Sequence, residues 1–207
     1  MTHSGRETQL WYWLLYSGVL PTTRAKNLLS SWAAEGLSAE SVLDSLPTTA
    51  SQAGLNNAEA NALKPPKTLE TVTALRWNEA LYPKALQTLD LKLRPALLFY
   101  KGNLKLLERS MLAIPPAPME TVTTLLLQET LSQVLGDTSL LAALRGSTQA
   151  TILLGELADS EGDALLFVRQ GLGTIEITGE EQRLLNDGRL LLLSPLNPAA
   201  PANAKWE

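Results

Sequence analysis

Basic side chains near the middle of the chain have the clearest potential for chemistry. Lys101, Lys105 and Arg109 recur every four residues, which predicts that they share one face of a helix. Lys84 and Arg94 lie shortly before them, within the only local excess of positive charge. Cationic side chains of this kind neutralise backbone phosphates, which dominates the affinity of proteins for nucleic acids. These residues are candidates for nucleic-acid contacts, and a solvated basic face is the other interpretation.

Acidic side chains gather further along the chain. Glu156, Asp159, Glu161 and Asp163 place four carboxylates within eight residues. Carboxylates are suitable ligands for divalent cations, but they also favour the first turn of a helix, where the helix dipole is positive. We interpret this cluster as a solvated helix start and expect no metal site. The same charges would repel a phosphate.

The composition excludes several kinds of catalytic site. The chain has no cysteine, so it has no disulfide, thiolate zinc site or cysteine nucleophile. Its one histidine, His3, lies close to the amino terminus, which removes a Ser-His-Asp arrangement and histidine acid-base catalysis as realistic interpretations. Walker-type loops and metal-ligand spacings are also absent from the sequence. We therefore expect no enzyme activity and no cofactor.

The net charge of −4 is unevenly distributed. Residues 1–68 contain five basic and five acidic side chains, and residues 69–110 contain seven basic and four acidic ones. Residues 111–207 contain five basic and twelve acidic side chains, so the carboxyl half is acidic. A phosphate-binding domain usually carries a basic patch, which only residues 69–110 provide.

The first third of the chain predicts a small helical domain. Apolar residues recur at helical spacing, and Gly, Pro and Ser stand where helices would end or begin. The expected helices are Glu7–Ser17, about Thr23–Glu35, a third from Ser38 to Pro47, and about Asn57–Leu63. The stretch Lys64–Lys67, which contains two prolines, is the best candidate for a domain boundary.

Beyond this boundary, strands and helices are expected in turn. The predicted strands are Met111–Ile114, Thr151–Leu154, Thr174–Thr178 and Leu190–Leu193. The predicted helices are Met119–Leu144, with a break at Gly136 and Asp137, then Asp159–Gln170 and Glu180–Asn186. Such alternation is typical of a mainly parallel sheet in an α/β fold. The expected division is therefore 1–64 helical, 68–110 leading into the sheet, 111–195 α/β, and 196–207 an irregular tail.

The segment Trp77–Asn103 carries a resemblance to a known family. Its motif residues are Tyr82, Pro83 and Leu86, then Pro95, Leu98 and Tyr100, with one extra residue between the last two, then Lys101, Gly102 and Asn103. This order resembles the Y-P-x-x-L turn, P-x-x-L-Y strand and K-G-N turn of the DprA/Smf family, the DNA processing proteins of bacterial transformation. The resemblance implies a Rossmann-like domain after a small helical domain, and binding of single-stranded DNA with its delivery to the RecA recombinase.

Two family hallmarks are altered in this chain. Where the family has a G-S-R phosphate turn after the first strand, the chain has Pro115, Pro116, Ala117 and Pro118, and proline supplies no backbone N–H donor. The family's S-G-x-A-x-G-I-D motif is matched only loosely by residues 155–163, with Gly155 in the place of the first glycine. We therefore expect no phosphate cradle at the first of these turns.

Three functions remain open at this point. The first is a non-catalytic, DprA-like protein that binds single-stranded DNA in recombination or transformation. The second is a diverged relative that has lost nucleic-acid binding and serves as a protein-interaction or scaffold subunit, or as a homo-oligomer. The proline turn, the acidic carboxyl half and the end of the chain at Glu207, before the part where the family carries much of its basic surface, favour this alternative. A nucleotide-processing enzyme is a weaker third idea, because the chain has no glycine-rich phosphate turn.

The sequence also bears on location. No apolar run reaches the roughly 18 to 20 residues that span a bilayer, and residues 1–9 lack the basic and apolar layout of a secretion signal. We expect no membrane association and a cytoplasmic location.

Overall fold

Helices form the beginning of the chain, as the apolar periodicity predicts. The computed structural model describes residues 3–46, 50–51, 53–118, 120–135, 140–201 and 204, and it divides the chain after Leu98 into two units. The first unit contains helices α1 (His3–Tyr16), α2 (Thr22–Ala34), α3 (Ala39–Asp44) and α4 (Asn57–Ala62). Their apolar faces bury Leu10, Trp11 and Trp32 in the core. All four predicted helices are confirmed.

Local signals fix where these helices begin and end. Ser38 and Asn56 each form a capping box at the start of α3 and α4. Gly36 ends α2 with a φ of 72°, a backbone conformation that glycine adopts without strain. The buried carboxylate of Glu7 accepts hydrogen bonds from the backbone N–H groups of Ala39 and Glu40, at 2.8 and 3.0 Å. Glu7 thereby attaches the first turn of α3 to α1.

The first unit also contains strand β1 (Ala74–Arg76) and the short helix α5 (Lys84–Gln87). Trp77 contacts Trp11 edge to face, with ring centroids 5.1 Å apart. The buried Tyr82 hydroxyl donates a hydrogen bond to the carbonyl of Pro95 at 2.7 Å, and burial raises its pKa. The tyrosine and proline of the Y-P and P-x-x-L-Y motifs therefore close one loop of the fold.

A six-stranded sheet has the order β1-β2-β6-β5-β4-β3. Its remaining strands are β2 (Leu97–Gly102), β3 (Met111–Ile114), β4 (Leu140–Leu144), β5 (Ala164–Phe167) and β6 (Leu190–Ser194). Strands β3 to β6 are parallel to their neighbours, and β2 is antiparallel to β6. The fold is thus α/β and Rossmann-like, with a mainly parallel sheet that follows a small all-helical region, as the sequence predicts.

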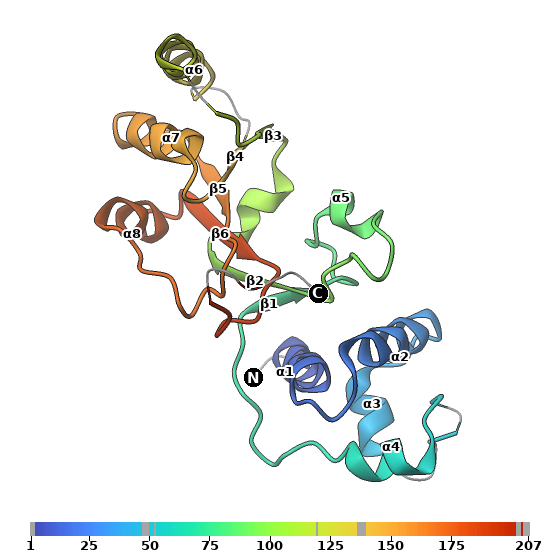
Figure 1. Cartoon of the computed structure of the whole chain (residues 1–207). Helices are drawn as coiled ribbons and strands as arrows, with labels where there is room; N and C mark the ends of the chain where they lie inside the picture. The colour runs from blue at the N-terminus through green and yellow to red at the C-terminus, as the bar shows by residue number, and fades with distance from the viewer. Residues whose placement is uncertain are drawn as a thin grey trace. The chain divides into compact units, whose positions relative to one another are not determined.

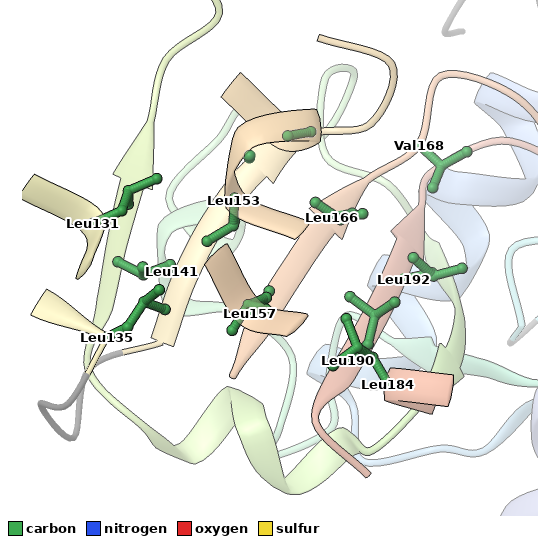
Figure 2. Packing of buried hydrophobic residues seen from close by; sticks show 13 residues of the cluster. Leu131, Leu135, Leu141, Leu153, Leu157, Leu166, Val168, Leu184, Leu190 and Leu192 are labelled. Carbon is green, nitrogen blue, oxygen red and sulfur yellow. The ribbon is translucent and has the colours of Figure 1, made fainter. Parts of the chain in front are cut away.

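Helices α6 (Thr121–Val134), α7 (Thr148–Ala158) and α8 (Gly179–Asn186) cover one face of the parallel strands (Figure 1). Each strand from β3 to β6 lies beside the next one in the chain, so right-handed connections place all three helices on the same side. The core between these layers is almost entirely aliphatic, as Figure 2 shows for Leu141, Leu153, Leu166 and Leu192.

The strand predictions for the second half are partly wrong. Met111–Ile114 and the strand at Leu190 are confirmed, but Thr151–Leu154 lies inside α7, and Thr174–Thr178 is a loop that ends in the N-cap of α8. Thr178 caps α8 with its hydroxyl, which is the role that threonine often has before a helix. The β-branched residues of both segments suggested strands, but Thr151 and Ile152 lie on the partly exposed side of a helix, and Thr178 is a helix cap.

Two of the helix predictions for the second half are wrong where the structure has strands β4 and β5. The helix expected over Met119–Leu144 is α6 in its first part, but Leu140–Leu144 is strand β4; the expected break at Gly136 and Asp137 lies outside the described residues. The helix expected over Asp159–Gln170 contains strand β5. These strands consist of Leu, Ala and Phe, and a short apolar run buried on both faces has no period that separates it from a helix.

Candidate functional site

The carboxyl ends of the four parallel strands define the place where this fold would bind a ligand. The register pairs Leu144 with Phe167, and Phe167 with Leu193, so these strands end along the same edge of the sheet. In open α/β sheets, ligands bind beyond this edge. We call the loops at 115–118, 145–147, 168–178 and 195–201 the carboxyl edge.

The turn after β3 offers no phosphate cradle. Three of the residues from Pro115 to Pro118 are prolines, which have no N–H to donate. The carbonyl of Ala117 accepts a hydrogen bond from the Gln149 side chain at 2.7 Å, and Gln149 is buried. The Gln149 side chain therefore attaches this turn to α7. A ligand that used the same polar groups would have to break this hydrogen bond.

The turn after β4 consists of Arg145, Gly146 and Ser147. Gly146 has a φ of 83°, and the Ser147 hydroxyl accepts from the N–H of Ala150 at 3.1 Å, which caps α7. The second strand was predicted at residues 151–154, and the second family motif was therefore expected directly after it, but these residues lie in α7. Gly155 lies in the interior of α7, with open space around it, and not in a turn after a strand.

Arg145 is the one basic side chain of that turn, and it is already paired. Its Nε lies 2.6 Å from Glu181 Oε1 and its Nη2 lies 2.9 Å from Oε2, a bidentate ion pair. The same Nη2 donates to the carbonyl of Glu176 at 2.6 Å. The Glu181 side chain is only 2% exposed. Burial alone would raise the pKa of its carboxyl, but hydrogen bonds from Arg145 and Thr178 outweigh burial and lower it. Arg145 is therefore not free to neutralise a phosphate.

The other loops of the carboxyl edge also bond to one another. The Ser194 hydroxyl, which is fully buried, donates to the carbonyl of Gln170 at 2.8 Å. The N–H of Gly171 donates to the carbonyl of Ala200 at 2.8 Å, and the N–H of Gly173 to that of Pro198 at 2.9 Å. The described part of the tail is thus fastened across the edge. These hydroxyl and backbone N–H groups, which could bind a ligand, are instead hydrogen-bonded to other loops of the protein.

The K-G-N turn also has a structural role. Gly102 has a φ of 111°, and a Cβ at this position would collide with the carbonyl of Leu190. The Asn103 side chain donates to the carbonyl of Gly188 at 2.9 Å and accepts from the N–H of Lys105 at 3.1 Å. This turn therefore joins β2 to the start of β6.

The structure separates the five basic residues that were expected to contact nucleic acid. Lys84 and Arg94 belong to the first unit, and Lys101, Lys105 and Arg109 belong to the second. The expectation that the last three share one face of a helix is wrong. Lys101 lies in β2, Lys105 in the 3₁₀ helix Leu104–Glu108, and Arg109 just after it. A 3₁₀ helix has three residues per turn, so a spacing of four does not align side chains on it.

Arginines and lysines differ in what they contact. Arg109 pairs with Asp163, Arg24 with Glu59, and Arg94 donates twice to the carbonyl of Leu89. In contrast, the residues that the structure describes provide no ion pair for four lysines of residues 84–105. These are Lys84, Lys92, Lys101 and Lys105, all exposed.

The acidic cluster lies at the end of a helix and not at its start. Asp159 is the C-cap of α7, and Asp163 pairs with Arg109. Arg189 donates to the carbonyls of Leu157, Ser160 and Gly162, which places a cation at the negative end of the helix. No three His, Asp or Glu side chains are grouped to hold a metal ion in the ranges that the structure describes.

A groove in the first unit brings together basic residues that are far apart in the sequence. It has a volume of about 460 Å³ and is lined by Thr22, Thr23, Lys26, Asn27, Leu91 and Lys92. Lys26 is 7% exposed, and its Nζ donates to the carbonyl of Lys92 at 3.3 Å. Lys26 was not among the candidate residues predicted from the sequence. Only its position beside Ala25 on an amphipathic helix could have suggested that this lysine is buried.

Comparisons with known proteins identify the fold. No family model matches the chain, and no curated protein matches its sequence. Among solved structures, DNA processing protein A (DprA) from Streptococcus pneumoniae is similar, with a TM-score of 0.61 and 18% sequence identity. The match covers 92% of this chain and 68% of that protein. The chain therefore has a DprA-like fold.

None of the helices in the described ranges combines the length and the apolar character that a membrane crossing requires.

Proposed function

We propose that this chain is a non-catalytic DNA-processing protein that binds single-stranded DNA through its backbone phosphates. The observation that carries the proposal is the set of exposed lysines in residues 84–105 for which the described part of the chain provides no ion pair, together with the DprA-like fold. Lys101 and Lys105, on β2 and the following 3₁₀ helix, are the contacts in the second unit. Arg109 and Arg94 are bound to partners within the protein and have a supporting role.

The expected mode of binding follows from the kind of side chain. Flexible lysines attract phosphates as point charges, so binding depends on salt and little on base sequence. The carboxyl edge takes no part, because Arg145 is paired and the turn after β3 has prolines in place of N–H donors. The resemblance of residues 77–103 to the DprA/Smf family further suggests that the bound strand is delivered to the RecA recombinase, in the cytoplasm.

Fluorescence anisotropy of a labelled single-stranded oligonucleotide tests this proposal. The wild type should bind in the micromolar range or tighter at 50 mM salt and lose affinity at 200 mM, since counterions are released on binding. The double variant Lys101→Gln with Lys105→Gln should flatten the logarithmic salt dependence by about 1.4, because each phosphate contact on a single strand contributes about 0.7. Lys64→Gln with Lys67→Gln, at exposed positions before β1, is the matched control. An absence of binding at low salt would reject the proposal.

A second candidate function is supported by exposed apolar residues at one side of the sheet. Strand β3 forms the end of the sheet, where Met111 and Leu112 are 42% and 51% exposed. Leu125 and Leu126 of α6 are 61% and 58% exposed. An exposed apolar edge strand is a template for another chain. The chain would then be a protein-interaction subunit, with a partner that adds a strand to β3.

Sedimentation velocity of the wild type and of Leu112→Lys distinguishes this candidate. An oligomer or a co-purifying complex that Leu112→Lys dissolves would favour a protein-interaction subunit. A wild type that sediments as a monomer, with no bound protein, would remove the support that β3 gives to this function.

A further inference from the structure

Strand β3 ends the sheet, but its residues are those of an interior strand. Met111–Ile114 are all apolar, a run typical of strands that are covered on both faces of a parallel sheet. Met111, Leu112 and Ala113 are nevertheless exposed, and the described residues place no strand beyond β3. Edge strands that stay uncovered usually carry charged side chains, which prevent pairing with other chains. The composition of β3 therefore favours pairing with a further strand.

The open side of β3 presents backbone groups for such pairing. The carbonyl of Ser110 accepts from the N–H of Leu140 in β4 at 2.7 Å, so it points toward β4. Backbone polar groups of successive strand residues point to alternate edges, so Met111 and Ala113 direct their N–H and C=O groups to the open side. Pro115 follows directly and has no N–H to donate, which limits the pairing to β3 itself.

Helix α6 is exposed at the same end of the second unit. Figure 1 shows α6 as the last helix of the row α8, α7, α6, just as β3 is the last strand of the sheet. Ile114 of β3 and Leu131 of α6 pack in one apolar core, so α6 lies against the face of the sheet beside this edge. Leu125 and Leu126 of α6 are mostly exposed. Sheet and helix layer thus both end in apolar surface.

A second copy of this chain fits both layers at once. A two-fold axis perpendicular to the sheet makes β3 antiparallel to β3 of the second copy and keeps the helices of both copies on one face. The two α6 helices then lie side by side over the joined strands. Residues 110–135 contain only two charged side chains, Glu120 and Glu129, so a strongly charged partner finds few matching charges there. The same, nearly uncharged surface of a second copy needs none.

We propose that two copies of this chain form a dimer in which their β3 strands pair antiparallel and their α6 helices pack together. Leu112 pairs in register with Leu141, which belongs to the core under the helices, so Leu112 lies on the helix-covered face. With Leu112 on the two-fold axis, it lies opposite Leu112 of the second copy on that face. Met111 and Ala113 then exchange backbone hydrogen bonds with Ala113 and Met111 of the second copy.

The dimer should be weak and reversible. Strand β3 has 4 residues and α6 has 14, fewer together than the roughly 20 to 30 residues a side of a standard interface. Association should therefore depend on protein concentration over the micromolar range. The inference deepens the second candidate function, on which it rests, by naming its partner, and it does not require DNA binding.

Disulfide formation between copies tests the register, because the chain contains no cysteine of its own. Leu112→Cys places two thiols opposite each other in a non-hydrogen-bonded pair, where Cα atoms are about 4.5 Å apart and a disulfide can form. Mild oxidation should convert most of this variant to a covalent dimer, as measured by non-reducing electrophoresis. Gln182→Cys, at an exposed position of α8, is the matched control and should stay monomeric.

Sedimentation velocity over a range of protein concentrations tests the contact between the helices. The wild type should dimerise reversibly. Leu126→Lys should weaken the dimer at least about tenfold, because like charges that meet across an interface cost several kcal/mol. Leu126 is exposed, so this variant should fold. Gln182→Lys adds the same charge on α8 and should leave dimerisation unchanged.

The outcomes separate this inference from both candidate functions. A covalent Leu112→Cys dimer, together with weaker association of Leu126→Lys, supports the inference. A monomeric wild type, a dimer that Leu126→Lys leaves unchanged, or a Leu112→Cys variant that crosslinks no more than Gln182→Cys overturns it. A different protein that co-purifies and is released by Leu126→Lys also overturns it, but leaves the second candidate function in place. The measurements contain no DNA, so their results are independent of the proposed DNA binding.

Discussion

The carboxyl edge of the parallel sheet and the Lys26–Lys92 groove differ in whether their basic side chains form ion pairs with carboxylates. At the carboxyl edge, the partly exposed Arg145 is bonded to the buried carboxylate of Glu181, and the neighbouring loops form hydrogen bonds with one another. In the groove, Lys92 has no carboxylate partner in the described residues, and the space between the lining residues is open to solvent. In this protein, the polar groups at the edge of the sheet where such folds usually bind ligands are engaged in bonds that stabilise the fold. The binding proposed above relies instead on exposed lysines of residues 84–105, for which the described residues provide no ion pair.

The largest expected effect is at Arg145. Arg145→Met leaves the buried Glu181 carboxylate without its cation, which should lower the free energy of unfolding by about 3 kcal/mol, the lower end of the range for broken buried pairs. Lys92→Met should change it by less than about 0.5 kcal/mol, as expected for an exposed side chain. Urea denaturation measures both. If both variants lowered the free energy of unfolding equally, the distinction between Arg145 as a structural residue and Lys92 as an unpaired surface residue would be contradicted.

Acid should reveal the same ion pair. The pKa of Glu181 is lowered by folding, so its contribution to stability is present above the unfolded pKa of about 4.3 and is lost as the pH falls through the folded value. The stability difference between the wild type and Glu181→Gln should therefore shrink below about pH 4.3. Urea denaturation of both proteins between pH 3 and 7 measures this difference. A constant difference over that range would show that the charge of Glu181 does not stabilise the fold.

Two glycines test where the turn after β4 lies. Gly146→Ala forces a side chain into positive φ and should destabilise the protein by about 1 kcal/mol. Gly155→Ala replaces a glycine inside α7, where no other atoms crowd the new methyl group, and should stabilise it by about 0.5 to 1 kcal/mol. Thermal unfolding compares the two variants. The opposite order would place the strained turn at Gly155, where the sequence motif suggested it.

A similarly modest effect is expected at the connection between α7 and the proline turn. Gln149→Leu removes the donor to the carbonyl of Ala117, and Ala117 is exposed, so water can replace that bond. We expect a loss of about 1 kcal/mol in the free energy of unfolding. Gln128→Leu, at a half-buried position of α6, is a control for the change of side chain. If Gln149→Leu created binding of inorganic phosphate, the carboxyl edge would be a latent site and not a lost one.

Local chemistry explains which parts of the fold could be predicted from the sequence. The helices before residue 64 carry their own boundaries, such as Ser38 at a cap and Gly36 at a stop, and these signals act over a few residues. Strands β4 and β5 consist of good helix formers, and only their burial between layers makes them strands. Their assignment depends on tertiary contacts that a local pattern does not contain.

The candidate site was less predictable than the fold for the same reason. The proline turn could be identified as a poor phosphate site because the absence of N–H donors is a property of the residues themselves. The pairing of Arg145 with Glu181 and the meeting of Lys26 with Lys92 join residues 36 and 66 positions apart. No spacing rule connects positions so distant, so the groove could be found only in three dimensions.

The most direct test of the central claim compares DNA binding by variants of the two kinds of charge. The measurement is anisotropy of a labelled single-stranded oligonucleotide at low salt with Lys101→Gln/Lys105→Gln and with Arg145→Met, after both variants are shown to be folded. We predict that the lysine variant binds at least about tenfold more weakly, since it has lost two phosphate contacts, and that Arg145→Met binds as the wild type does. Loss of binding in Arg145→Met, with the lysine variant unaffected, would contradict the account and return the binding site to the carboxyl edge.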